Sequence, residues 1–319
     1  KSPMTVNQLE TNARFVGFLL VRSADARTDK KGGSYLDLTL ADKTGDINCK
    51  YWDWNELMDV PKQGLVIKVL VQEYNGRKQL RIERMRAALP QDEVDMAQLV
   101  ACAPEKPEVM RKDIEDTIDT FQSEGLKKIV REMLRLTGDK LEWFPAAQRL
   151  HHAERSGLLH HTTSMLNLAR HVVAAYPFLN AELLYAGVIL HDLCKTTEMI
   201  SDETGSVSDY SADGLLIGHL VRGVARIEEA AKNVGVSGEI VLLLEHMVLS
   251  HHSIPEYGSP KAPMFPEAEV LARIDDLDAK MNEMQGILSR VPEGAFSEKV
   301  WSLDRRIYHP KYQEIDGAE

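Results

Sequence analysis

The first 88 residues alternate between apolar and polar side chains in short runs, a pattern typical of half-buried β-strands. The clearest run is 35–41, where Leu36, Leu38 and Leu40 share one face. Turn signals such as Asn75-Gly76 separate it from the other β-rich runs, which cover 14–22, 45–52, 65–73 and 78–86. The chain therefore begins with five predicted strands.

A short helix is expected at 54–59, between the third and fourth strands. Five strands with a helix in that position match the OB-fold, a small barrel used for binding oligonucleotides. Residues 1–88 are therefore predicted to form an OB-fold nucleic-acid-binding domain.

The rest of the chain is predicted to be helical. Residues 89–124 hold 10 acidic and 3 basic side chains and three prolines, which predicts an acidic linker that becomes helical near Arg111. Helical periodicity without convincing strand alternation continues to about residue 284 and places an all-α domain at 125–291. Residues 292–319 are expected to wrap the surface as a C-terminal extension. The predicted fold class is multi-domain α and β, with a barrel followed by helices.

Charge is unevenly distributed along the chain. The formal net charge is −11, yet residues 1–88 carry 15 Lys and Arg against 11 Asp and Glu, while residues 89–319 carry 23 against 38. Such asymmetry hints that the basic part contacts nucleic acid. A surplus of four charges is also ordinary variation, so charge alone leaves both interpretations open.

The three cysteines are far apart and odd in number, which favours reduced thiols and a cytoplasmic location. No apolar run approaches the length of a membrane span, and no secretory signal is visible, so no membrane partner is expected.

Candidate metal ligands occupy the apolar sides of the predicted helices. In the helix after Gly157, His161 shares a face with Met165 and Leu168, whereas His160 is predicted to face solvent. Each of the others follows an apolar helix or lies on an apolar face: His191, Asp192, His219, His251, His252 and Asp275. Imidazole and carboxylate suit a first-row divalent ion that activates water. Any one of these histidines alone would be explained as an ordinary core or surface residue. The ordered set favours a metal centre, because burying so many ionisable groups is otherwise costly.

The order H…HD…H…HH…D resembles that of the HD superfamily of metal-dependent phosphohydrolases. Within it, the chain is most similar to the YhaM-type 3′→5′ exoribonucleases, which join an N-terminal OB domain to an HD domain. The stretches that carry the resemblance span 151–153, 157–162, 191–195, 249–252, 256–260 and 274–281. One departure is Cys194, where the family usually has glycine; it removes no ligand.

The resemblance implies two ions that share Asp192. One would be bound by His161, His191, Asp192 and Asp275, and the other by Asp192, His219, His251 and His252. Mn²⁺ is expected, with Mg²⁺, Fe²⁺ or Co²⁺ as alternatives. Lys195, one turn beyond Asp192, is predicted to act in catalysis by reaching a phosphate oxygen, although a surface lysine fits the sequence equally well. Supporting roles are predicted for His151, His152, His246 and Asp278.

An RNA surface is predicted on the strand domain, where aromatic rings and cations would hold a single strand. The candidates are Lys31, Tyr35, Lys50, Trp52, Arg77 and Arg81. Hydrophobic packing is the alternative role for the tryptophans, Trp52 and Trp54.

The resulting hypothesis is a metal-dependent 3′→5′ exoribonuclease that acts on single-stranded RNA. Its polarity and its choice of RNA over single-stranded DNA rest on the resemblance alone. The alternatives are an HD-type phosphohydrolase of nucleotides or cyclic dinucleotides, and a non-enzymatic nucleic-acid-binding scaffold with a relic metal site. The oligomeric state stays open, a homo-oligomer included.

Overall fold

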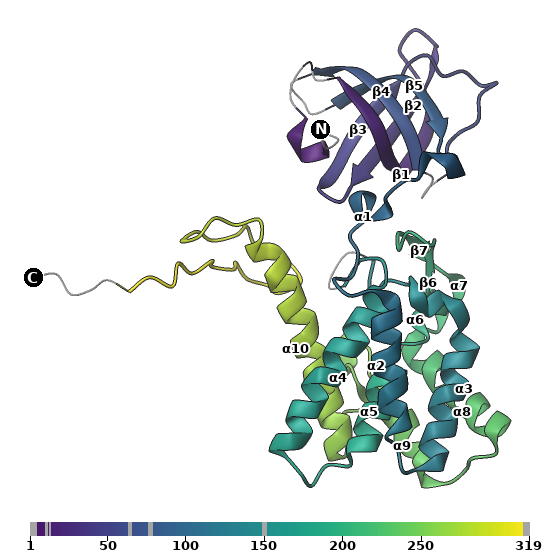
Figure 1. Cartoon of the computed structure of the whole chain (residues 1–319), viewed down its shortest axis with the longest axis vertical. Coiled ribbons are helices and arrows are strands. Elements are labelled where there is room, and N and C mark those ends of the chain that lie inside the picture. The colour runs from purple at the N-terminus through teal and green to yellow at the C-terminus, as the bar shows by residue number, and fades with distance from the viewer. Residues whose placement is uncertain are drawn as a thin grey trace, which may run out of the picture.

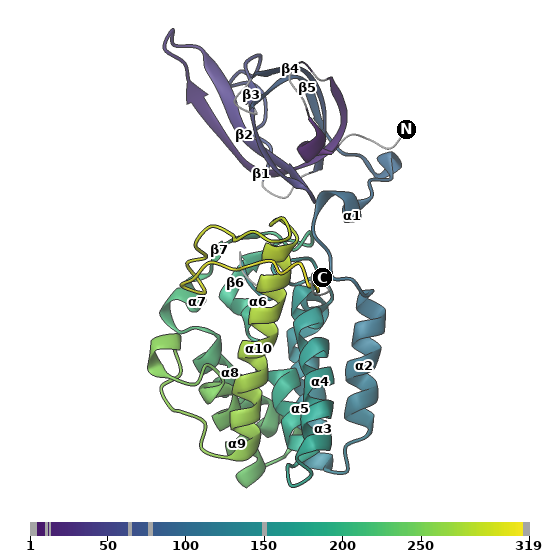
Figure 2. The ribbon, with the colours of Figure 1, turned by 90° about the vertical axis from the view of Figure 1, so that its left-hand side faces the viewer.

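The computed structural model describes residues 5–9, 12, 14–62, 66–75, 79–148 and 152–314. A strand domain and a helical domain follow one another along the long axis of the molecule (Figure 1). The short helix α1 (Met96–Leu99) lies in the segment that joins them (Figure 2).

The strand domain is a closed five-stranded barrel with the order β1-β2-β3-β5-β4. Its strands are β1 (Phe15–Thr28), β2 (Ser34–Asp42), β3 (Gly45–Tyr51), β4 (Val66–Asn75) and β5 (Gln79–Ala87). Neighbouring strands are antiparallel except β3 and β5, which are parallel. Leu36, Leu38 and Leu40 point inward and are fully buried, because alternate side chains of a strand share a face. This topology is that of the predicted OB-fold.

The helix predicted at 54–59 is wrong, since this segment forms turns. The Asn55 side chain accepts a hydrogen bond from the Leu57 N–H at 2.9 Å, a local bond that competes with helix formation. The Trp54 ring donates to the Asp59 carbonyl at 3.3 Å and is itself 6% exposed, in the barrel core. Core packing of the tryptophan therefore shapes this segment.

The helical domain contains seven helices of ten residues or more among the described residues. They are α2 (Pro107–Asp119), α3 (Glu124–Thr137), α4 (Gly157–Ala175), α5 (Ala181–Leu190), α8 (His219–Val234), α9 (Glu239–Ser250) and α10 (Pro266–Leu288). Two short helices, α6 (Lys195–Glu198) and α7 (Ala212–Leu216), complete the part that surrounds the candidate site.

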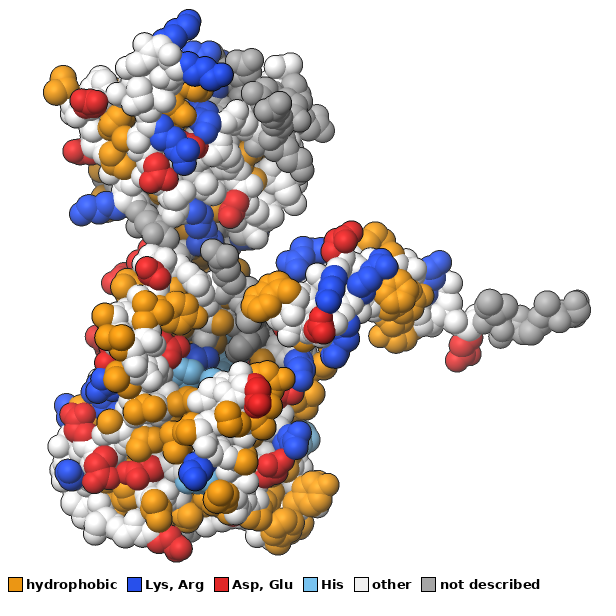
Figure 3. Space-filling view, turned by 180° about the vertical axis from the view of Figure 1, so that it is seen from behind, with side chains coloured by type: hydrophobic (Ala, Val, Ile, Leu, Met, Phe, Trp, Pro, Cys, Tyr) orange, Lys and Arg blue, Asp and Glu red, His pale blue; other side chains and the backbone are white. Residues whose placement is uncertain are grey.

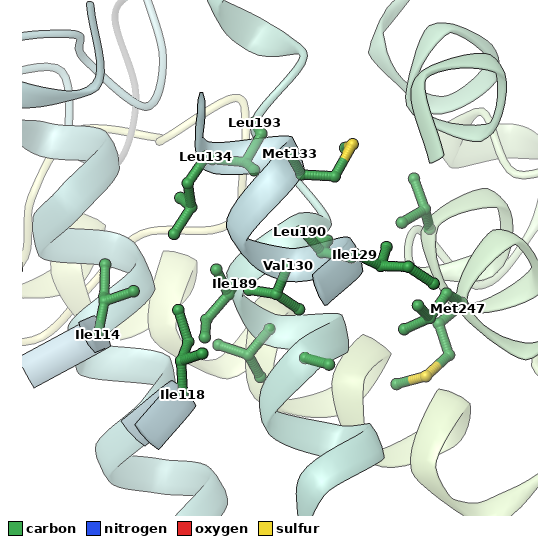
Figure 4. Packing of buried hydrophobic residues seen from close by; sticks show 14 of the residues in the cluster. Ile114, Ile118, Ile129, Val130, Met133, Leu134, Ile189, Leu190, Leu193 and Met247 are labelled. Atoms are coloured by element: carbon green, nitrogen blue, oxygen red, sulfur yellow. The ribbon is translucent and has the colours of Figure 1, made fainter. Parts of the chain in front are cut away.

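The core of this domain lies where α2, α3, α5 and α9 meet (Figure 4). Helix α3 begins at Ser123, whose side chain accepts from the Leu126 N–H, and it then buries residues at helical spacing, including Ile129 and Met133. Helix α5 is buried on almost every side. It packs against α9 at Gly187, where a Cβ would lie 2.3 Å from the Met247 Cε atom, the flexible end of that side chain.

Two features differ from the sequence-based expectation. A short antiparallel hairpin, β6 (Met199–Ser201) and β7 (Val207–Tyr210), interrupts the helical domain. Strands of three and four residues are too short to give a recognisable alternation. The segment that follows α10 extends away from the helices instead of wrapping them (Figure 1), and the bridges Phe296–Tyr308 and Val300–Arg305 fold it back on itself.

Hydrogen bonds connect the barrel to the helical domain and to the segment between them. The Arg22 guanidinium donates to the Ser206 hydroxyl at 2.5 Å, between β1 and the β6–β7 turn. The Lys43 N–H donates to the Gln98 carbonyl of α1 at 3.0 Å. Among the described residues, no helix combines the length and apolar character needed to cross a bilayer.

Candidate metal centre

The structure brings all seven predicted ligands together. They come from three long helices and from the segments that end two others: His161 from α4, His191 and Asp192 from the end of α5, His219 from α8, His251 and His252 from the end of α9, and Asp275 from α10. One group comprises His161, His191, Asp192 and Asp275, and a second comprises His219, His251 and His252, with the ligand atoms of each group within 4.8 Å of one another. Histidine side chains are visible in a recess of the helical domain (Figure 3).

Asp192 faces both groups through different oxygen atoms. Its Oδ2 lies 3.3 Å from the Nε2 of His191. Its Oδ1 lies 3.4 Å from the Nε2 of His219 and 3.4 Å from the Nε2 of His251. This is the position that a carboxylate shared by two ions requires.

The Nδ1 atom of every predicted histidine ligand already has a hydrogen-bond partner. The partners are Asp278 Oδ2 for His161 (2.7 Å), the Val188 carbonyl for His191 (2.6 Å), Glu198 Oε2 for His219 (2.6 Å), the Val248 carbonyl for His251 (2.7 Å) and the Tyr257 carbonyl for His252 (2.8 Å). A neutral imidazole that donates from Nδ1 presents its lone pair at Nε2. Each ring is therefore oriented and held in the tautomer that a metal ligand needs.

Three buried atoms in the centre have no hydrogen-bond partner among the described residues: Asp192 Oδ1, His219 Nε2 and His251 Nε2. Leaving such an atom unsatisfied costs about 1–3 kcal/mol. The three atoms face one another, and imidazole nitrogen with carboxylate oxygen is a donor set that suits a first-row divalent cation. The residues therefore fit such an ion.

In the first group, the imidazoles and carboxylates shift one another's pKa values. Burial alone would lower the pKa of His191, but the carboxylates of Asp192 and Asp275 raise it to about 9. Conversely, burial favours protonated carboxyls, yet the neighbouring histidines hold the pKa values of Asp192 and Asp275 well below their usual range. The His161 Nε2 lies only 2.9 Å from the Asp275 Oδ1. A bound cation would replace the protons in these pairs.

In the second group, burial would lower the pKa of His219, but Asp192 and Glu198 raise it, whereas the other two histidines have the opposite tendency. Burial and the neighbouring His251 and His219 lower the pKa of His252 to about 3. Burial also lowers the pKa of His251. Both rings therefore stay neutral, the state in which they bind metal.

Lys195 is buried rather than exposed. Its Nζ atom lies 2.9 Å from the Asp192 Oδ2 and donates to the Ala146 carbonyl at 3.0 Å. The structure thus directs this ammonium group at the Asp192 carboxylate, and the surface-lysine alternative is wrong.

The residues predicted to have supporting roles occupy different places. Asp278 accepts from His161, and its Oδ2 also lies 2.8 Å from the His152 Nε2. His246 lies elsewhere: its Nε2 accepts from the Met264 N–H at 3.0 Å, so it holds the segment before α10. His151 lies outside the described residues.

Sequence reasoning missed Glu198. Its carboxylate accepts from both the backbone N–H and the Nδ1 of His219, each at 2.6 Å. It stands in α6, which has four residues, so no periodicity marks it. His160 was predicted to face solvent, but it is half-buried and contacts His152 and Glu154.

On the barrel, four of the six predicted RNA-binding residues lie near one another: Tyr35, Lys50, Trp52 and Arg81. The Tyr35 and Trp52 rings lie 4.5 Å apart, and the Lys50 Nζ lies 5.7 Å from the Tyr35 ring centre. Lys50 is paired with Arg81 across β3 and β5, which places both side chains on one face. The Lys50 Nζ also lies 2.7 Å from the Asp37 Oδ1, so its charge is partly neutralised.

The other two predicted RNA-binding residues are Lys31 and Arg77. Lys31 is exposed in the turn between β1 and β2. Arg77 lies outside the described residues.

Two solved structures are similar to about a quarter of this chain. The second OB-fold domain of replication protein A from Methanococcus maripaludis is 18% identical, covering 28% of this chain and 94% of that chain, with a TM-score of 0.22. A replication protein A heterotrimer bound to single-stranded DNA is 16% identical, covering 28% and 83%, with a TM-score of 0.22.

The helical domain matches the family model described as "HD domain" over residues 158–280. Curated relatives match nearly the whole chain. The protein named 3′-5′ exoribonuclease YhaM from Geobacillus sp. (strain WCH70) is 42% identical over 305 residues, covering 93% of this chain and 92% of the relative. Its namesake from Listeria innocua is 40% identical over 301 residues, covering 93% and 95%. The chain belongs to the YhaM family of 3′-5′ exoribonucleases.

Proposed function

We propose that this protein is a metal-dependent 3′→5′ exoribonuclease that hydrolyses single-stranded RNA with two divalent ions, and that these are Mn²⁺ ions. The observation that carries the proposal is the convergence of seven ligand side chains, with every imidazole bonded at Nδ1. When bound, the ions activate a water molecule and offset the charge of the scissile phosphate.

The residues of the chain would divide the work as follows. One ion would be held by His161, His191, Asp192 and Asp275, and the other by Asp192, His219, His251 and His252. Lys195 would act as a positioning residue, because its Nζ atom contacts the Asp192 carboxylate and does not point into open space. It would fix the shared carboxylate and balance its charge.

The barrel would hold the RNA strand. Tyr35 and Trp52 offer adjacent rings on which bases can stack, each base contributing about 1–3 kcal/mol. Arg81 is exposed on the same face as Lys50 and supplies a phosphate contact. A surface of this kind holds a strand without reading its sequence.

A cytoplasmic location is part of the proposal. All three cysteines are free, with Cys49 and Cys194 buried and Cys102 exposed, as suits a reducing compartment.

The test uses one RNA oligomer labelled at either the 5′ or the 3′ end, incubated with Mn²⁺, Mg²⁺ or a chelator. Degradation from the 3′ end gives a ladder of shortening products from the 5′-labelled RNA, and immediate release of labelled mononucleotide from the 3′-labelled RNA. A DNA oligomer of the same sequence tests the sugar preference. Hydrolysis of nucleotides or cyclic dinucleotides without a ladder on RNA would instead support the small-nucleotide alternative.

A further inference from the structure

Three side chains gather beside the seven-ligand centre without belonging to it: His152, Glu154 and His160. The Nδ1 atoms of the two histidines lie 3.1 Å apart. The Glu154 Oε1 lies 2.5 Å from the Nδ1 of His160 and 3.6 Å from the Nδ1 of His152. Two imidazole nitrogens and one carboxylate oxygen thus form a compact triangle.

The hydrogen bonds of Asp278 determine which nitrogen of His152 faces this triangle. Asp278 accepts from the Ser164 hydroxyl and from the Nδ1 of His161. Its Oδ2 also lies 2.8 Å from the Nε2 of His152, which is therefore the donor. A neutral His152 that donates from Nε2 presents the lone pair of its Nδ1 to His160 and Glu154.

We propose that His152 Nδ1, Glu154 Oε1 and His160 Nδ1 bind a third divalent cation of the first transition row, separate from the two ions of the catalytic centre. Ligands about 2.0–2.2 Å from a metal lie roughly 3–3.5 Å from one another, close to two sides of this triangle. The third side, 2.5 Å between Glu154 and His160, is a hydrogen-bond distance, and a cation would replace the proton there. Two histidines and one carboxylate leave coordination positions open for water or another oxygen ligand.

Backbone hydrogen bonds fix the position of His152 at this site. His152 has a φ of +48°, and its carbonyl accepts from the Ala146 N–H at 3.1 Å while its N–H donates to the Asn282 side chain at 2.8 Å. Gly157 makes the close approach feasible, because a Cβ there would lie 2.0 Å from the His152 carbonyl oxygen. His152 is 3% exposed and is held over the first turns of α4, which carry His160.

The third site would be coupled to the catalytic centre through one carboxylate. A cation on the Nδ1 of His152 keeps the proton on its Nε2, so that His152 continues to donate to Asp278. Asp278 in turn holds His161, a predicted ligand of the first ion. The third cation would therefore help to orient His161 without contacting it.

The experiment counts Mn²⁺ bound to the full chain. Wild-type protein and the variants Glu154→Gln, His160→Ala, Asp192→Ala and His171→Ala are dialysed against a series of Mn²⁺ concentrations, and bound metal is measured by mass spectrometry. His171 is the matched control, since it is exposed on the same helix and its Nδ1 lies 2.8 Å from the Asn167 carbonyl of that helix. Anomalous scattering from Mn²⁺-soaked crystals gives the position of each ion.

Wild type and His171→Ala should bind three ions per chain, and Glu154→Gln and His160→Ala should bind two. The anomalous map should show a peak between His152, Glu154 and His160 in wild type and in Asp192→Ala. Survival of this peak in Asp192→Ala separates the site from the proposed exoribonuclease activity, which that variant lacks.

Either of two results would overturn the proposal. The first is no anomalous peak at the triangle in wild type, which would mean that these side chains share a proton instead. The second is the loss of all ions from His160→Ala and Glu154→Gln, which would make the cluster a support of the catalytic centre.

Discussion

The two oxygens of Asp192 make unequal contacts. Oδ2 has the Lys195 ammonium group at 2.9 Å, whereas Oδ1 has only the two imidazole nitrogens at 3.4 Å, outside hydrogen-bond geometry. A residue in this position is hard to replace, because asparagine supplies one ligand oxygen and alanine supplies none.

We expect Asp192→Ala to lower RNA hydrolysis by about 1,000-fold or more, since it removes the carboxylate that both ions would share. Bound metal, measured by mass spectrometry, should fall with turnover, while circular dichroism should show retained helices. A variant with normal turnover would rule out a shared carboxylate.

Metal binding should release protons. The pKa of His191 is raised to about 9 in the metal-free protein, so at about pH 7.5 this ring is charged and must lose its proton to bind an ion. Apparent affinity for Mn²⁺ should therefore rise as the pH increases toward 9. Titration calorimetry in buffers of different ionisation enthalpy measures the release directly; a heat of binding that does not depend on the buffer would contradict it.

At the scale of single residues, the sequence predicted which side chains gather in the centre better than it predicted the residues that support them. His161 could be found because helical spacing places it with Met165 and Leu168 on a buried face. Glu198 could not, since its contact with His219 spans 21 residues and follows no period. Supporting contacts of this kind depend on how the helices pack.

At the scale of elements, the packing of α8 against α9 brings two carboxyl groups together, Glu228 of α8 and Glu245 of α9. Burial and the neighbouring Glu228 raise the pKa of Glu245 to about 7, and its Oε1 is buried without a hydrogen-bond partner among the described residues. Because the folded-state pKa lies above the usual value, the folded protein binds the extra proton. The free energy of unfolding therefore falls as the pH rises from about 4.5 to 7.

We expect Glu245→Gln to stabilise the helical domain above pH 7 by about 1 kcal/mol, a value discounted because both carboxyls are partly solvated. Thermal unfolding at low and high pH measures the effect, with Glu229→Gln on the exposed side of α8 as the control. If both variants stabilised the protein equally, or if Glu245→Gln gave no stabilisation at high pH, Glu245 would not be the cause of the pH-dependent stability.

Periodicity predicts an element well when the element is long and one face is buried. Strand β2 and helix α3 meet both conditions, and their patterns identify them. The Trp54–Asp59 segment carries a similar mixture of residues but is too short for a period to decide, so local hydrogen bonds determine its turns. The β6–β7 hairpin escapes prediction for the same reason.

At the scale of the whole molecule, the metal centre lies entirely in the helical domain and the aromatic pair entirely in the barrel. The alternation of the strands and the order of the ligands were enough to predict both domains. Their junction was not predictable, because a contact such as that between Arg22 and Ser206 depends on how two folded surfaces meet.

We expect deletion of residues 1–88 to weaken binding of long RNA and to reduce its salt dependence, because the barrel supplies phosphate contacts. Hydrolysis of a very short oligomer should persist. In the full chain, Tyr35→Ala should reproduce part of the binding loss, by about 1–3 kcal/mol per lost stacked base.

The informative quantity is the ratio of long-substrate to short-substrate activity in full-length and truncated protein. An equal decrease on both substrates would mean that the barrel stabilises the helical domain and does not hold RNA. Lys43→Ala, a basic residue outside the Tyr35–Trp52 surface, serves as the control for charge alone.

The order of the ligands along the chain has a consequence for biosynthesis. The first group needs His161 from α4 and Asp275 from α10, so its two ends are made far apart in time on the ribosome. Domains fold from the N-terminus as they emerge, and the barrel can therefore form while the helical domain is still being made. A nascent chain that has not yet released α10 therefore has a folded barrel but an incomplete metal centre, so it can become active only after the last long helix has been made.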